Sequence, residues 1–166
     1  MKLTTLATIL LALALSPSIQ AESTVKITGV HNCCKKCDDG IINAVKSVEG
    51  ASAATNKGDV TITAKDDETA KKAVAALLAA GYAGKGAEPS ASEAASTAKV
   101  KTATVSGVHL CCGKCVTAAD KAVMSVKGVT KHDATKGAAT FSVEGSFSPK
   151  ALLAALNKAG LNGTVK

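Results

Sequence analysis

The spacing of hydrophobic residues changes several times along the chain, and each spacing predicts an element. Val25 and Ile27 alternate with lysine and threonine, as in a strand with one buried face. After Gly29, apolar residues recur at helical spacing from Cys37 until Gly50 stops the pattern. We therefore expect a strand, a loop, and a helix that begins at Cys37.

Hydrophobic spacing and turn residues also predict a hairpin, a second helix and a short strand. Residues 51–64 read as a hairpin around the turn sequence Asn56-Lys57-Gly58-Asp59, whose Asn and Gly tolerate positive φ. Residues 70–78 form a second amphipathic pattern that ends at Gly81, and residues 82–85 are a short candidate strand. The order β-α-β-β-α-β is that of a ferredoxin-like sandwich, an α+β fold.

A second copy of this pattern follows. Phe141 matches Ile62 and Gly160 matches Gly81, and Ser148-Pro149 is a good start for the last helix. Residues 86–99 between the copies lack bulky apolar side chains and read as a flexible linker. We expect two ferredoxin-like sandwiches in tandem, at residues 23–85 and 100–166.

The first 21 residues resemble a secretory signal peptide. Lys2 precedes an apolar run, and residues 16–21 form a helix-breaking, small-residue cleavage region. The run is too short to span a bilayer, although an uncleaved anchor is the competing interpretation. The leader predicts an exported protein, periplasmic or secreted, without stable membrane insertion after cleavage.

Charge and aromatic content argue against a nucleic-acid partner. The formal net charge is +7, but every basic residue is lysine, and the chain has no Arg or Trp, two Phe and one Tyr. Sequence-specific and single-strand nucleic-acid binders rely on arginine forks and stacking aromatics. The sequence also contains no catalytic Ser-His-Asp set, paired-carboxylate motif or phosphate loop, so we predict no enzyme.

All six cysteines lie in two copies of one motif, His-x-Cys-Cys-x-x-Cys. The copies start 78 positions apart, at the junction of the first strand and first helix of each predicted sandwich. The candidate metal ligands are His31, Cys33, Cys34, Cys37, His109, Cys111, Cys112 and Cys115. Thiolates at such a junction face helix amides and the positive end of the helix dipole, which favours their charged form.

The donor set points to a thiophilic ion, about one per domain. Three sulfurs and an imidazole suit tetrahedral Zn(II), whereas thiolates alone suit Cu(I). The sequence leaves open whether the two histidines bind the ion, since each is equally consistent with a loop histidine that hydrogen-bonds to the backbone. A structural disulfide is the alternative for the thiols, but three per motif always leave one over, and a bond between neighbours is strained.

Both copies resemble heavy-metal-associated domains, the modules of copper chaperones, of the periplasmic mercury-binding protein and of metal-transporting P-type ATPases. The resemblance covers residues 24–85 and 101–166 and implies that Cys34/Cys37 and Cys112/Cys115 are the family's ligand pairs. It also implies a supporting role for Tyr82, where the second copy has Leu161. The loop here is two residues longer than the family's, lacks its Met, and carries the additional Cys and His.

We expect a non-enzymatic, exported protein that buffers or transfers a heavy metal ion, Cu(I) or Zn(II) ahead of Hg(II) or Cd(II). Another metal-carrying protein is a candidate partner. Two alternatives stay open. One is a thiol-disulfide oxidoreductase that uses the Cys-x-x-Cys pairs, and the other is an interaction module in which the ion only fixes a surface.

Overall fold

The computed structural model describes residues 21–87 and 96–166, which we call the first and second unit. The expected leader, residues 1–20, and residues 88–95 of the expected linker lie outside this part. The first unit contains β1 (Ser23–Ile27), α1 (Lys35–Lys46), β2 (Ala51–Asn56), β3 (Asp59–Ala64) and α2 (Asp67–Ala79). The second contains β4 (Val100–Ser106), α3 (Gly113–Met124), β5 (Val129–His132), β6 (Thr140–Phe147), α4 (Pro149–Lys158) and β7 (Thr164–Val165).

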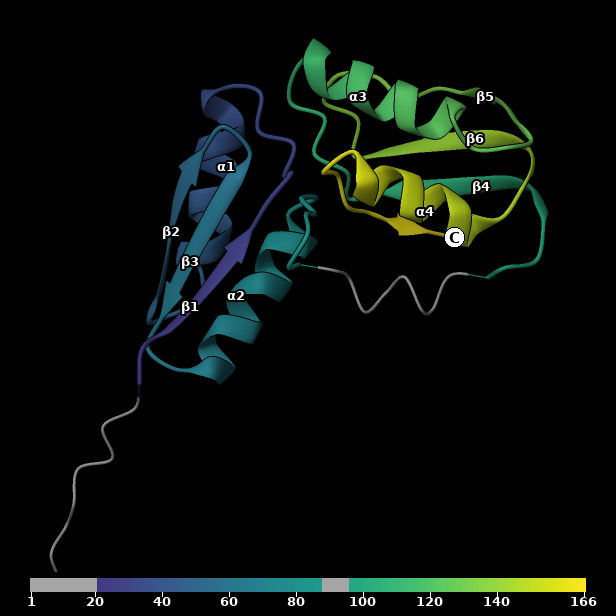
Figure 1. The fold of residues 1–166 in the computed structure, drawn as a ribbon. Helices are drawn as coiled ribbons and strands as arrows, with labels where there is room; N and C mark the ends of the chain where they lie inside the picture. Colours follow the sequence, from purple (N-terminus) through teal and green to yellow (C-terminus); the bar gives the residue numbers. More distant parts are fainter. Residues whose placement is uncertain (1–20, 88–95) are drawn as a thin grey trace, which may run out of the picture.

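Each unit is an α+β layer pair with its own antiparallel sheet and two helices (Figure 1). The strand order is β1-β3-β2 in the first sheet and β5-β6-β4-β7 in the second. The helices of each unit pack against each other and against strands of their own sheet. None of the helices in the described part is long and apolar enough to cross a membrane.

The first helix starts two residues earlier than predicted. Cys34 is extended (φ −165°) and occupies the N-cap, and its carbonyl accepts hydrogen bonds from the N–H groups of Cys37 (2.8 Å) and Asp38 (3.2 Å). Helix α1 therefore begins at Lys35, and Cys37 lies in its first turn. The hydrophobic period misplaced this start because the first helical positions, Lys35 and Lys36, are exposed and polar.

The starts of α2 and α4 agree with their capping residues. The Asp66 side chain accepts a hydrogen bond from the Thr69 N–H at 2.7 Å, and α2 follows directly. Ser148 caps α4 in the same way, and Pro149 is its first residue. Side chains at these two N-caps satisfy amides that the helix itself leaves without a partner.

The hairpin turns hold the cysteine loops in place. In the first unit Lys57 and Gly58 take positive φ (49° and 98°), so Lys57 rather than the expected Asn56 is left-handed. The Gly58 carbonyl accepts from the Val30 N–H at 2.9 Å, just before the first cysteine loop. In the second unit the Gly137 N–H donates to the Leu110 carbonyl at 2.7 Å, inside the other loop.

The cores follow the predicted periodicity. Ile27, Ile41 and Leu77 are fully buried in the first unit, and Val105 and Leu156 in the second. Full burial of such side chains stabilises a fold by about 1.5–3 kcal/mol each. Cys37 and Cys115 are also fully buried and belong to this apolar cluster. The last cysteine of each motif is therefore anchored by packing as well as by its helix.

The fourth strand of the first unit, predicted at residues 82–85, does not form as such. Lys85 makes one bridge to Thr28, whereas Tyr82 pairs antiparallel with Leu161 of the second unit. The Ala83 N–H donates to the Gly160 carbonyl (3.2 Å), and the Asn162 N–H donates to the Gly81 carbonyl (2.8 Å). Lys85 thus stays beside β1, whereas Gly81 and Ala83 bond to the second unit, which a pattern within one unit cannot reveal.

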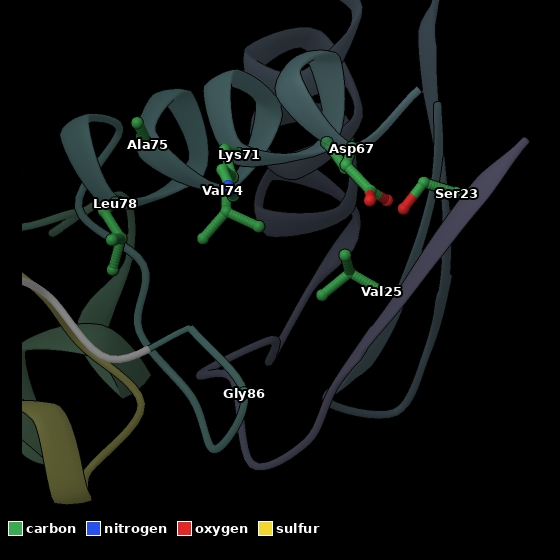
Figure 2. A pocket seen from close by; sticks show the side chains of 9 residues that line it. Ser23, Val25, Asp67, Lys71, Val74, Ala75, Leu78 and Gly86 are labelled. Atoms are coloured by element: carbon green, nitrogen blue, oxygen red, sulfur yellow. The ribbon is translucent and has the colours of Figure 1, made fainter. Parts of the chain in front are cut away.

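The incomplete sheet leaves a groove beside β1. Figure 2 shows this groove between β1 and α2, with Val25 and Val74 facing it and Asp67 near its rim. Its volume is about 420 Å³, and Gly86 lies at its far end. No histidine or cysteine lines it, so it is separate from the candidate metal ligands.

Replacement of Gly160 by alanine should separate the two units. Its φ is +78°, and a Cβ there would meet the backbone of Gly29 and His31 in the first unit. Gly137 has the same backbone conformation (φ +79°) with nothing near its Cβ position. Both substitutions should cost about 1 kcal/mol of backbone strain. Only Gly160→Ala should also raise the radius of gyration in small-angle X-ray scattering. Equal radii for the two variants would contradict the packing described here.

Candidate metal centre

The eight predicted ligands lie in two loops that face each other. The first cysteine loop, residues 31–37, joins β1 to α1, and the second cysteine loop, residues 109–115, joins β4 to α3. Both loops end at a helix N-terminus whose N-cap is a cysteine, Cys34 or Cys112. Two positive helix ends therefore converge on the same group of sulfurs.

Within each loop the sulfurs lie close together. The Sγ atoms of Cys34 and Cys37 are 3.8 Å apart, and those of Cys112 and Cys115 are 3.7 Å apart. In the second loop the extra cysteine, Cys111, lies 3.6 Å from Cys115. All six cysteines are free thiols. The Cys-x-x-Cys spacing thus brings each pair to a separation that one ion can bridge.

The sulfurs are equally close between the loops. The Sγ atom of Cys33 lies 3.4 Å from that of Cys112 and 3.7 Å from that of Cys115. Cys111 lies 3.8 Å from Cys34 and 3.6 Å from Cys37. The two motifs, 78 positions apart in sequence, therefore form one six-thiol cluster.

Both histidines of the motifs lie beside this cluster. The Nε2 atoms of His31 and His109 are buried and have no hydrogen-bond partner. One ring nitrogen of His31 lies within 4.8 Å of the sulfurs of Cys33 and Cys115, and one of His109 lies equally near those of Cys37 and Cys111. Buried polar atoms without a partner are uncommon and call for an explanation, of which an ion is one.

Burial keeps both imidazoles neutral. Desolvation lowers the pKa of His31 and that of His109, and the charge of His31 lowers the pKa of His109 further. A neutral imidazole is the form that binds metal ions. Both histidines thus lie beside the sulfurs in the neutral form that a metal ligand requires.

Backbone amides divide the thiols into two kinds. The N–H of Cys37 lowers the pKa of Cys34, and the N–H of Cys115 lowers the pKa of Cys112 to about 6, although neither sulfur makes a full capping hydrogen bond. Burial raises the pKa of Cys33 and Cys111, with neighbouring thiols as further causes. The N-cap cysteines therefore ionise more readily than Cys33 and Cys111 in the absence of an ion.

The cluster is open to solvent on one side. A hollow of about 710 Å³ is lined by Cys33, Cys34 and Cys112, with Lys114 among the other lining residues. Lys35, in contrast, pairs with Asp39 at 3.0 Å on the exposed helix surface. A second molecule can approach the N-cap thiols without any movement of the core.

Tyr82 supports both loops at once. It is fully buried, its hydroxyl donates to the Cys37 carbonyl at 3.3 Å, and its ring centroid lies 4.6 Å from that of His109. Burial raises the pKa of Tyr82, which keeps the phenol protonated as a donor. Leu161, the matching residue, is buried but has no hydroxyl, so the surroundings of the two loops differ.

Some contacts of the loops were not predicted from the sequence. Asp38 accepts hydrogen bonds from Asn32 and Thr55, both at 2.6 Å, which ties the first loop to β2. His132, which lies outside both loops, is mostly buried: its Nδ1 accepts from the Ala134 N–H and its Nε2 lies 2.9 Å from an oxygen of Asp120. No motif marks these residues, because their partners come from neighbouring strands and helices.

The residues present fit a thiophilic ion. In the part of the chain that the structure describes, donors of the right chemical type lie within 4.8 Å of one another in four groups of three. Both imidazoles belong to such a group, and the Nε2 atom of each is buried without a hydrogen-bond partner. Three such donors, or four with a histidine, match the ligand sets of Cu(I) and Zn(II).

Comparisons with known proteins add little to this description. No family model matches the chain, and no curated protein matches it. One solved structure with a partial likeness is described as the N-terminal soluble domains of Bacillus subtilis CopA. It is 16% identical, with 89% of this chain and 95% of that chain covered, and a TM-score of 0.31. A TM-score of this size does not establish a common overall structure.

The reduced, metal-free protein should react with alkylating agents in a defined order. Cys34 and Cys112 should be modified before Cys33 and Cys111 at pH 7, because only the thiolate is the nucleophile. Labelling of Cys112 should slow as the pH falls through about 6, where its thiolate is protonated. Mass spectrometry of peptides after short labelling times measures this order. In denaturant the difference should vanish, and an order that persists there would show that local sequence causes it.

Proposed function

We propose that this protein is a non-enzymatic carrier or buffer of a thiophilic metal ion, Cu(I) or Zn(II), in the periplasm or outside the cell. The six-thiol cluster carries this proposal, since sulfurs from two loops lie as close as 3.4 Å without forming disulfides. The resemblance of the motifs to heavy-metal-associated domains supports it. The signal-like leader is the basis for the export.

The surroundings of the cluster suit ion binding. Three thiolates around Zn(II) leave a net charge of −1, and around Cu(I) a net charge of −2. The N-termini of α1 and α3 both point at the sulfurs and can offset this charge. The buried histidines supply neutral nitrogen donors if the ion prefers four ligands.

The open side of the cluster supports transfer rather than permanent storage. Cys34 and Cys112 line the hollow, so an acceptor's thiolates can enter the coordination sphere before those of the donor leave. Structural zinc sites, in contrast, are usually closed by four protein ligands. An ion held here can move to another protein by ligand exchange, without release into solution.

Metal binding should depend on the cysteines and reach two ions per chain. We expect the reduced protein, titrated without oxygen, to bind Cu(I) or Zn(II), and a variant with all six cysteines replaced by serine to lose that binding. Competition with a chromophoric chelator measures both. Equal affinities for the two proteins would overturn the proposed function.

Thiol-disulfide exchange is the second candidate, because the N-cap thiol Cys112 has a pKa near 6. Reduction of insulin disulfides by the metal-free protein, lost in Cys115→Ser, would favour this activity instead. We expect no reduction above the background of free dithiol. A third thiol, that of Cys111, lies 3.6 Å from Cys115 and would compete with Cys112 for the disulfide that a two-cysteine redox cycle requires.

Transfer of the ion should be faster than its spontaneous release. We expect the rate at which Cu(I) leaves the loaded protein to rise in proportion to the concentration of a dithiol acceptor. Stopped-flow absorbance follows the exchange, and dilution into buffer with a trace of chelator gives the spontaneous rate. A rate independent of acceptor concentration would indicate storage, since release would then precede capture.

A further inference from the structure

We propose that each of the two ion sites is assembled from both units: the Cys-x-x-Cys pair of one loop is completed by the His-x-Cys of the other. One site comprises Cys34, Cys37, Cys111 and His109, and the other comprises Cys112, Cys115, Cys33 and His31. This inference rests on the proposed function and specifies its sites. The alternative is that each cysteine loop binds one ion with its own ligands alone.

The first site is defined by three mutual sulfur contacts. Cys34 and Cys37 are 3.8 Å apart, and Cys111 of the second loop lies 3.8 Å from Cys34 and 3.6 Å from Cys37. A ring nitrogen of His109 lies within 4.8 Å of the sulfurs of Cys37 and Cys111. These four residues are a Cys3His set drawn from both loops.

The second site repeats the arrangement with the units exchanged. Cys112 and Cys115 are 3.7 Å apart, and Cys33 of the first loop lies 3.4 Å from Cys112 and 3.7 Å from Cys115. A ring nitrogen of His31 lies within 4.8 Å of the sulfurs of Cys33 and Cys115. Together the two sites use all eight candidate ligands once each.

The residues that follow Cys33 and Cys111 have extended backbone. Cys34 is extended (φ −165°, ψ 166°), and so is Cys112 (φ −151°, ψ 171°). The sulfur of Cys33 stays within 4.8 Å of those of Cys34 and Cys37 and also reaches the facing loop, 3.4 Å from that of Cys112. Cys111 likewise lies 3.6 Å from Cys115 of its own loop and 3.6 Å from Cys37 of the facing loop.

The backbone between the units holds this arrangement. The paired segments at Tyr82 and Leu161 place Gly160 against the first cysteine loop, where the His31 N–H donates to the Gly160 carbonyl at 3.0 Å. The Asn162 side chain adds a bond to the Leu78 carbonyl at 2.8 Å. The ion therefore binds where the two units are already joined, and its binding should stabilise that junction.

Paired cysteine variants of the full chain test the assignment. Cys112→Ala/Cys115→Ala removes one pair and leaves the first site with two possible third ligands. In this background Cys111→Ala should weaken Cu(I) binding at least tenfold, and the matched control Cys33→Ala should change it less than threefold. In Cys34→Ala/Cys37→Ala the order should reverse, with Cys33→Ala the damaging change. Anaerobic chelator competition gives the affinities, and circular dichroism checks that each variant folds.

The histidines give a second readout with Zn(II), which favours four ligands. In the Cys112→Ala/Cys115→Ala background, His109→Ala should weaken Zn(II) binding at least tenfold, while His31→Ala should leave it within threefold. This comparison needs no buried cysteine beyond those already replaced. It therefore separates loss of a ligand from loss of folding.

The outcomes distinguish the two proposals. If the unsubstituted protein binds neither ion, the proposed function itself is wrong. If it binds ions but Cys33→Ala weakens the first site as much as Cys111→Ala does, or more, the sites are not shared and the proposed function stands. Loss of all binding in the parent double variants, with binding intact in the unsubstituted protein, would also overturn the two shared sites.

Discussion

Contact between two strand-to-helix loops is the constraint on which the rest of this structure depends. Each loop places its last cysteine in the core and its middle cysteine at a helix N-cap, and the sulfur of its first cysteine contacts sulfurs of the other loop. Thiols as close as 3.4 Å would repel strongly if all were ionised. Backbone amides lower the pKa of Cys34 and Cys112, whereas burial raises the pKa of Cys33 and Cys111, so these thiols do not all ionise together in the absence of an ion.

The junction between the units is made mainly of backbone. Positive-φ glycines at the ends of α2 and α4 let the following segments pair, and each lies against the facing cysteine loop. A side chain at Gly81 or Gly160 would push a loop away from its partner. These glycines therefore have a role beyond ending a helix, since they set the distance between the two halves of the cluster.

The near-symmetry of the cluster is broken by a few residues. Tyr82 donates to the loop that holds Cys37 and stacks on His109, whereas Leu161 only packs. Asn32 bonds to Asp38, whereas Leu110 is buried in the core of the second unit. Two ion sites with the same ligands can thus differ in affinity, a property suited to a protein that accepts and then passes on an ion.

The sequence by itself determined the elements and the donor atoms. Periodicity placed the helices and most strands, the Ser148-Pro149 signal located the start of α4, and the repeated motif identified all eight candidate ligands, because these signals are local. Only the tertiary structure decided how those ligands are grouped and why Tyr82 and Ala83 pair with the second unit and form no fourth strand in their own. Both depend on contacts between residues about 80 positions apart, such as Tyr82 with Leu161 and Cys33 with Cys112, which no local pattern encodes.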